Sequence, residues 1–187
     1  MINSLPGSSK RLLLLIACCL TLVDVFACQC EGVNTVKDNY DKALIVFTGK
    51  VIKIEYVGVA ETMNPDSIAV ARSIMTDMPR NTLDQPMVLK AHIVVTNEFK
   101  GIKKNDTIIV YTGIRGASCG YKFEQNKEYT IYAAKESYMH LFLRVNRKRF
   151  NNFDKAGVYW TSICTRTTVS VGQEEGMIRE YLNKSVR

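Results

Sequence analysis

The feature that most constrains the fold is a pair of cysteines near the start of the chain, Cys28-Gln29-Cys30, together with two distant single cysteines, Cys119 and Cys164. The other two of the six cysteines lie in an apolar leader. An even number of cysteines in an exported chain favours disulfides, and four cysteines allow three pairings. The alternative is a zinc site of four thiolates, but such sites usually contain two close cysteine pairs. We therefore expect two disulfides that tie the first residues to the body of the protein.

Residues 1–27 have the layout of a secretory signal peptide. Two basic residues come first, an apolar run follows from Leu12 to Val23, and Val25-Phe26-Ala27 ends in a small residue suited to cleavage. The run is too short to span a bilayer comfortably, so we predict a secreted protein with no transmembrane span that begins at Cys28. The alternative is a lipid-anchored protein whose first residue is Cys18, at the end of a lipobox-like stretch.

The remainder, residues 28–187, is about 160 residues long, which suits one domain with an ordinary core. Five runs rich in β-branched and aromatic residues alternate with turn residues, and no long helical pattern separates them. This spacing predicts a mainly β domain built as a small closed or nearly closed antiparallel barrel. Gly49, inside the first run, indicates a bulge. The expected strands are Leu44–Val57, Met87–Phe99, Thr107–Thr112, Glu128–Ala134 and Tyr159–Thr165.

Two short helices flank the expected strands. Asn34 or Thr35 is placed to cap a helix near the start of the domain. Ser170 and Gln173 form a capping box for a helix that runs to about Leu182. Apolar residues fall on one face of each helix, so we expect both helices to pack against the barrel.

Residues 58–86 form a long connection between the first two expected strands, with three of the four prolines of the chain. A short helix is predicted from Asp66 to Met75. A connection of this length inside a compact domain is usually functional or disordered. We expect disorder; the alternative is a projecting arm beside a surface that binds a partner.

The sequence contains no catalytic motif. His92 lies inside a strand pattern and His140 in an apolar stretch, and no metal-binding histidine spacing, nucleophile elbow or phosphate-binding glycine loop occurs. We therefore expect a protein that is not an enzyme and that needs no cofactor.

A basic cluster lies in the second half of the chain, which has a net charge of +7 overall. Such a cluster suits an anionic polysaccharide or an anionic membrane surface, and a solvated loop is the alternative. We expect no nucleic-acid partner. The cluster comprises Arg144, Arg147, Lys148 and Arg149.

Six short motifs follow one another along residues 28–187, outside the 58–86 connection. They are Cys28-Gln29-Cys30, Phe99-Lys100-Gly101, Ile109-Val110-Tyr111-Thr112, Ser118-Cys119-Gly120-Tyr121, Lys127-Glu128-Tyr129-Thr130-Ile131 and Ile163-Cys164-Thr165. Together they resemble the netrin-like module, and in particular the inhibitory N-terminal domain of the tissue inhibitors of metalloproteinases.

The resemblance implies a five-stranded OB-fold-like closed Greek-key barrel with one short N-terminal and one C-terminal helix. It also implies that Cys28 pairs with Cys119 and that Cys30 pairs with Cys164. In this family the α-amino nitrogen and the carbonyl oxygen of the first cysteine, here Cys28, chelate the catalytic zinc of the target proteinase. A catalytic zinc with three protein ligands keeps a position for water, which a bidentate group can take over.

By the same resemblance, the side chain of Gln29 enters the specificity pocket of the proteinase, and Ala117 and Ser118 form a second edge beside the first cysteine. We call Cys28, Gln29, Cys30, Ala117 and Ser118 the inhibitory edge. The chain departs from the family at Glu31 and Gly32, which replace apolar and proline residues. The expected function is secreted inhibition of zinc metalloproteinases. The alternative is a non-inhibitory netrin-like module that binds an acidic matrix or envelope partner.

Overall fold

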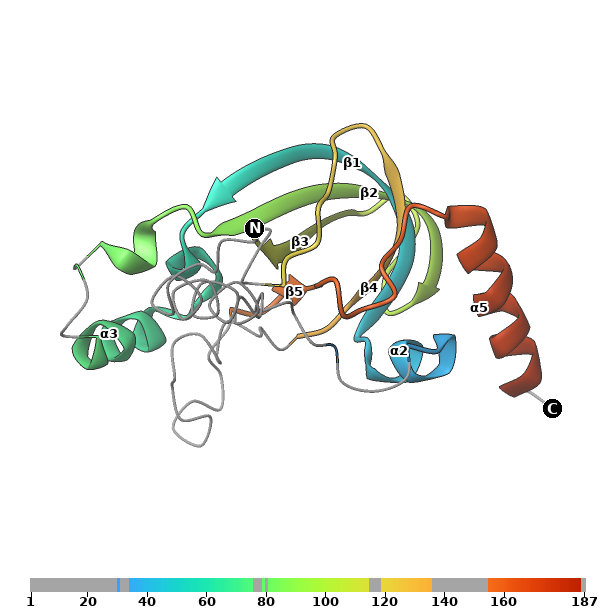
Figure 1. Cartoon of the computed structure of the whole chain (residues 1–187), viewed down its shortest axis with the longest axis horizontal. Coiled ribbons are helices and arrows are strands. Elements are labelled where there is room, and N and C mark those ends of the chain that lie inside the picture. Colours follow the sequence, from blue (N-terminus) through green and yellow to red (C-terminus); the bar gives the residue numbers. More distant parts are fainter. Residues whose placement is uncertain are drawn as a thin grey trace, which may run out of the picture.

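The computed structural model describes residues 30, 34–75, 79, 81–114, 119–135 and 155–185. This part of the chain is mainly β, with one five-stranded sheet in the order β4-β1-β2-β3-β5 and helices at both of its ends (Figure 1). The elements are α2 (Val36–Lys42), β1 (Ile45–Val57), η1 (Val59–Thr62), α3 (Pro65–Ile74), η2 (Thr82–Asp84), β2 (Val88–Lys100), β3 (Thr107–Gly113), β4 (Glu128–Ala133), β5 (Tyr159–Trp160) and α5 (Val171–Ser185).

The long strands β1 and β2 form the centre of the sheet. β1 pairs antiparallel with β2 on one side and with β4 on the other. The register between β1 and β2 shifts between Thr48 and Gly49, which confirms the bulge predicted at Gly49. A Cβ at this position would lie 2.6 Å from the Ile93 side chain, so the close approach of β2 requires glycine here.

The sheet is mixed, because β5 runs parallel to β3. The prediction of an all-antiparallel arrangement is therefore wrong at β5, which is also shorter than the expected strand. β5 pairs with β3, which is not its neighbour in the sequence, so no hairpin turn fixes the direction of β5 relative to β3. The sheet is not closed: β4 and β5 are its edges, linked by an isolated bridge in which Ala134 and Trp160 exchange hydrogen bonds of 2.9 and 2.8 Å.

The main core lies on one face of the sheet. Alternate residues of β2 point into it, as the pleat of a half-buried strand requires. Phe123 and Tyr129 add aromatic rings whose centroids are 5.0 Å apart. The buried residues of this cluster are Ile45, Phe47, Val51, Leu89, Ala91, Ile93, Val95, Val110, Phe123, Tyr129, Ile131 and Ala133.

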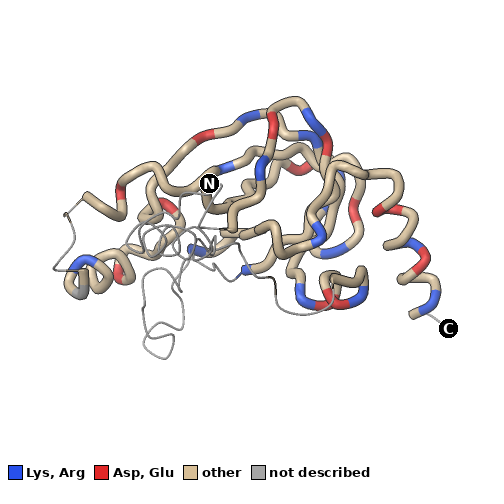
Figure 2. The backbone as a smooth tube through the Cα atoms, viewed as in Figure 1, with Lys and Arg blue, Asp and Glu red and all other residues tan. Residues whose placement is uncertain are grey.

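The helices α2 and α5 pack at one end of the sheet, as the apolar patterns predicted. The Thr35 side chain accepts a hydrogen bond from the backbone N–H of Asp38, which confirms the predicted cap of α2. Ile178 of α5 is fully buried against Val46 and Tyr132. Residues of both charges occur along α2 and α5 (Figure 2), which is typical of helices with a solvated side.

The connection 58–86 is ordered where the structure describes it, so the prediction of disorder is wrong. η1, α3 and η2 contribute Val59, Met63, Ala71 and Leu83 to a second core cluster, which covers Val88, Tyr111 and Trp160 of the sheet. Sequence periodicity did not reveal this packing because the apolar residues are divided among three short elements. Figure 1 places α3 at the end of the sheet opposite α5.

Candidate functional site

Most of the inhibitory edge lies outside the described residues. Cys28, Gln29, Ala117 and Ser118 belong to the part of the chain that is not described, as do the predicted signal peptide, His140 and the whole basic cluster. Cys30 is the one member of the inhibitory edge with a described position. The site is therefore built from Cys30 and from the elements that surround it.

A disulfide joins Cys30 to Cys164, with a Cα–Cα distance of 5.1 Å and a sequence separation of 134 residues. This is the pair that the resemblance implies for these two residues. Two of the four thiols are consumed by this bond, so the four-thiolate zinc site considered as an alternative does not form. The disulfide places the start of the domain on the segment that follows β5.

Cys119 lies against the same segment, because the backbone N–H of Ile163 donates a 3.0 Å hydrogen bond to the carbonyl of Cys119. Cys119 is disulfide-bonded too; its predicted partner, Cys28, is outside the described residues. The backbone of Cys119 is in the left-handed region, with φ of 53°, which is uncommon for a residue with a side chain. Three cysteine positions that are far apart in the sequence thus converge beside residues 163–164.

Gly120 explains why a Cys-Gly pair is needed at this point. A Cβ on Gly120 would overlap the carbonyl oxygen of Gly113, at the end of β3. The next residue, Tyr121, donates its backbone N–H to the Thr112 side chain at 2.8 Å. The element that carries Cys119 is therefore pressed directly onto the end of β3, and only glycine permits this contact.

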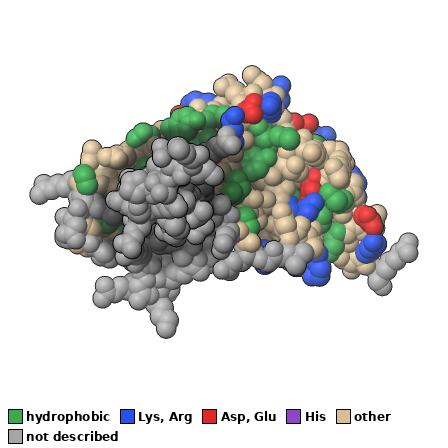
Figure 3. Space-filling model, viewed as in Figure 1, with side chains coloured by type: hydrophobic (Ala, Val, Ile, Leu, Met, Phe, Trp, Pro, Cys, Tyr) green, Lys and Arg blue, Asp and Glu red, His purple; other side chains and the backbone are tan. Residues whose placement is uncertain are grey.

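Exposed apolar side chains flank Cys119. Ile163 is 48% exposed and Ile114, which follows Gly113, is 37% exposed. On the face shown in Figure 3, hydrophobic side chains gather in the upper part of the molecule and in a smaller group on its right. Contiguous exposed apolar surface is a frequent mark of a protein-binding surface.

A second anchor holds the chain just after Cys30, and the sequence analysis did not identify it. Arg166 donates a 2.6 Å hydrogen bond from Nη1 to the carbonyl of Asn34, and its backbone N–H donates to Asn39 Oδ1 at 3.1 Å. The same guanidinium makes two 2.7 Å hydrogen bonds, from Nε and Nη2, to the two carboxylate oxygens of Glu174. We call Arg166, Glu174, Asn34 and Asn39 the Arg166 clamp. The signal in the sequence is weak: an arginine within the threonine-rich stretch 161–168.

Glu174 is the buried member of the clamp, with only 3% of the residue exposed. The hydroxyl of Tyr132 also donates to its Oε1, at 2.6 Å. Burial raises the pKa of Tyr132 well above its ordinary value, and the hydrogen bond to the Glu174 carboxylate raises it further. The hydrogen bond to Glu174 likewise raises the pKa of Arg166. The guanidinium therefore stays charged and the phenol stays neutral throughout the physiological range.

Threonine hydroxyl groups fix residues 161–168, the segment that contains Arg166, to β4. Thr167 Oγ1 accepts the backbone N–H of Tyr132 at 3.1 Å, and Thr161 Oγ1 donates to the Tyr132 carbonyl at 3.0 Å. Thr130 and Thr168 form a further bridge through two 2.9 Å backbone hydrogen bonds. Residues 161–168 are thus held along the edge of the sheet and provide a rigid base for both anchors.

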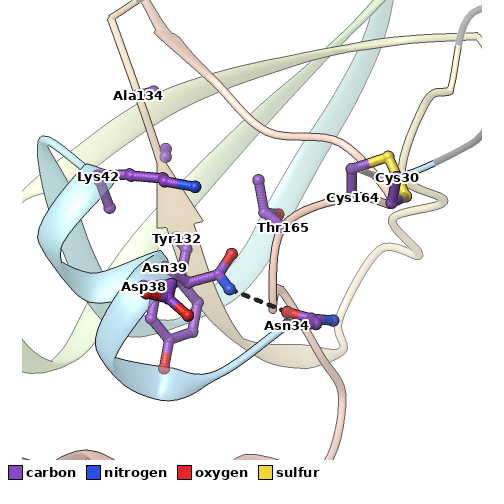
Figure 4. Close-up of a pocket in the computed structure, with 11 residues that line it drawn as sticks. Cys30, Asn34, Asp38, Asn39, Lys42, Tyr132, Ala134, Cys164 and Thr165 are labelled. Carbon is purple, nitrogen blue, oxygen red and sulfur yellow. Dashed lines mark hydrogen bonds between the residues drawn. A yellow bond between two sulfur atoms is a disulfide. The ribbon is translucent and has the colours of Figure 1, made fainter. Parts of the chain in front are cut away.

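A pocket of about 160 Å³ lies beside the disulfide (Figure 4). Its lining comes from three places: α2 with the residues before it, the end of β4, and the Cys30–Cys164 bond with Thr165. In Figure 4 the side chain of Lys42 extends across the pocket toward Thr165, and Asn39 donates to Asn34 at 2.9 Å.

His92 lies in β2 and is paired with a carboxylate. His92 Nε2 lies 2.6 Å from Glu55 Oε2, and Glu55 also pairs with Lys53 at 3.0 Å. In the part of the chain that the structure describes, His, Cys, Asp and Glu form no group of three suited to a metal ion. None of the helices there combines the length and apolar character needed to cross a membrane.

No protein-family model matches the chain, and no curated protein matches it either.

Proposed function

We propose that the chain is a secreted netrin-like inhibitor of zinc metalloproteinases, with an OB-fold-like arrangement of strands and an inhibitory edge that begins at Cys28. A mainly β domain with a helix near each end is compatible with this fold. A disulfide between Cys30 and Cys164 is compatible with an oxidising, extracellular compartment.

The observation that carries the proposal is the double anchoring of the chain around Cys30. The disulfide holds Cys30, and Arg166 holds the Asn34 carbonyl at 2.6 Å. Both anchors come from residues 164–166, and the preceding residue, Ile163, donates its backbone N–H to the carbonyl of Cys119. A segment fixed before binding loses little conformational entropy when it enters a cleft, and this preorganisation is what a tight protein inhibitor needs.

The chemistry assigned to Cys28 requires a free backbone terminus. Its α-amino group must be unprotonated to bind zinc, and an ordinary terminal pKa of about 7.7 to 8.0 makes this inexpensive at neutral pH. The amine and the carbonyl oxygen of one residue then displace the zinc-bound water of the target. Gln29, Ala117 and Ser118 would supply the contacts on either side.

The test is inhibition of a panel of zinc metalloproteinases by the exported protein, after N-terminal sequencing has shown Cys28 to be the first residue. A variant with one alanine added before Cys28 removes the chelating amine from its place. The matched control carries the added alanine after Arg187. We expect nanomolar to micromolar inhibition by the native chain and the control, and a loss of at least about a hundredfold, or about 2.7 kcal/mol, in the N-terminally extended variant.

Equal inhibition by the extended variant would refute chelation through Cys28. Absence of inhibition across the panel, combined with salt-sensitive retention on a heparin resin, would favour the non-inhibitory binding module instead. In that case neutralising Arg147, Lys148 and Arg149 should abolish retention.

A further inference from the structure

The pocket beside the disulfide has the size and the lining of a small-molecule site. Ala43, Ala133 and Ala134 are among its lining residues, as are both cysteines of the disulfide. Its volume of about 160 Å³ is close to that of an engineered protein cavity of about 150 Å³ that binds benzene. The available space therefore suits one ring or a short branched alkyl group.

Lys42 supplies a positive charge to this pocket and has no competing partner among the described residues. It follows Asp38 by four residues, a spacing at which ion pairs commonly form on a helix, yet no such pair is present. On the same helix, Lys37 and Asp41 do form this pair, at 2.6 Å. The Lys42 side chain instead extends across the pocket (Figure 4).

The charges at the rim decide which anion is favoured. Among the described residues that line the pocket, Lys42 is the one with a positive charge, and Asp38, which also lines it, carries a negative charge. A single positive charge beside a negative one disfavours multiply charged anions such as phosphate and favours a ligand with one negative charge. The apolar floor then favours an acid that carries a compact hydrophobic group.

We propose that this pocket binds a small monocarboxylate with a benzene-sized apolar group, whose carboxylate pairs with Lys42 and whose apolar group lies against the three alanines. Cys30 and Asn34 also line the pocket, so the ligand would contact both of the residues at which the start of the domain is anchored. The inference does not depend on metalloproteinase inhibition.

The test uses benzoate as the probe and the full exported chain, with binding measured by titration of backbone NMR shifts. We expect a dissociation constant on the order of 1 mM, with the shift changes centred on the pocket. Benzamide, a neutral molecule of the same shape, and acetate, which lacks the ring, should each bind at least about tenfold more weakly.

Two variants test the positive charge and the apolar lining of the pocket separately, and a third variant is the control. Lys42→Met removes the charge at an exposed position and should weaken benzoate binding about tenfold. Ala134→Leu fills the pocket and should abolish binding while Lys42 remains. Lys50→Met, at an exposed lysine that does not line the pocket, should leave the affinity unchanged. Equal binding of benzoate and benzamide, unchanged affinity in Lys42→Met, or shift changes centred elsewhere would overturn the proposal.

Discussion

Replacing Arg166 with methionine tests whether the Arg166 clamp is a structural anchor. The variant keeps most of the side-chain volume but leaves the carboxylate of Glu174, which is 3% exposed, without its two guanidinium hydrogen bonds. Breaking a buried ion pair from one side costs about 3 to 5 kcal/mol. Because Tyr132 still donates to Glu174 at 2.6 Å, we expect a loss near the lower limit, about 3 kcal/mol.

The chain contains a convenient probe for this measurement. Trp160 is its only tryptophan and is 2% exposed, so its fluorescence reports global unfolding in urea. The matched control is Arg179→Met in α5, where the arginine side chain is 61% exposed, its pair with Glu175 spans 3.9 Å and its guanidinium lies 5.7 Å from the centroid of the Phe99 ring. Exposed contacts of this kind contribute little, so the control should change the free energy of unfolding by less than about 1 kcal/mol.

The double variant Arg166→Met with Glu174→Leu provides an internal check. It removes both charges and should be more stable than Arg166→Met alone.

A loss of less than about 1 kcal/mol in Arg166→Met would refute the view that Glu174 depends on Arg166. So would a double variant no more stable than the single one. In the inhibition assay, Arg166→Met also releases the Asn34 carbonyl and should therefore weaken inhibition, whereas Arg179→Met should not.

Two further predictions concern the close backbone packing at Gly120 and the loss of folding stability at high pH. Gly120→Ala should lower the free energy of unfolding in urea by at least about 2 kcal/mol, because the added Cβ would overlap the backbone of Gly113. Gly176→Ala, which adds a Cβ in open space within α5, should instead raise it by about 0.5 to 1 kcal/mol. Similar effects at both sites would contradict the packing described. Burial raises the pKa of Tyr111 and of Tyr121 to about 12, so the stability they contribute is complete below about pH 10 and is lost as pH rises towards 12. Urea midpoints measured across that range should fall, and Tyr121→Phe should flatten the decline; an unchanged slope would count against the burial of the phenol.

The strands and helices whose patterns are local were predictable from the sequence. β1 to β4, α2 and α5 all occur within a few residues of their expected bounds, because alternation, capping residues and turn residues act over short distances. β5 was not predictable, because it pairs with β3, which is not its neighbour in the sequence, and its own short pattern does not identify that partner. The connection 58–86 was also misjudged, since its order depends on contacts with Val88 and Trp160 that no local pattern shows.

The candidate site likewise contains features that the sequence predicts and features that depend on long-range contacts. A disulfide framework was expected from the cysteine count, and the pairing of Cys30 with Cys164 agrees with what the resemblance implies. Arg166 was missed, although it contacts Asn34, Asn39 and Glu174, because these partners come from elements that only the folded sheet brings together. A polar residue in a threonine-rich loop looks solvated until its long-range partners are known.

The two anchors around Cys30 restrain the chain in different ways, and together they set its orientation. A disulfide by itself fixes a distance but leaves rotation about its single bonds. The hydrogen bond from Arg166 to the Asn34 carbonyl adds a second fixed point a few residues along the chain, and the guanidinium that donates it is held in place by the two oxygens of Glu174. Because Glu174 lies on α5 and Cys164 follows β5, the orientation of the first residues depends on how α5 packs on the sheet, and not on the cysteines alone.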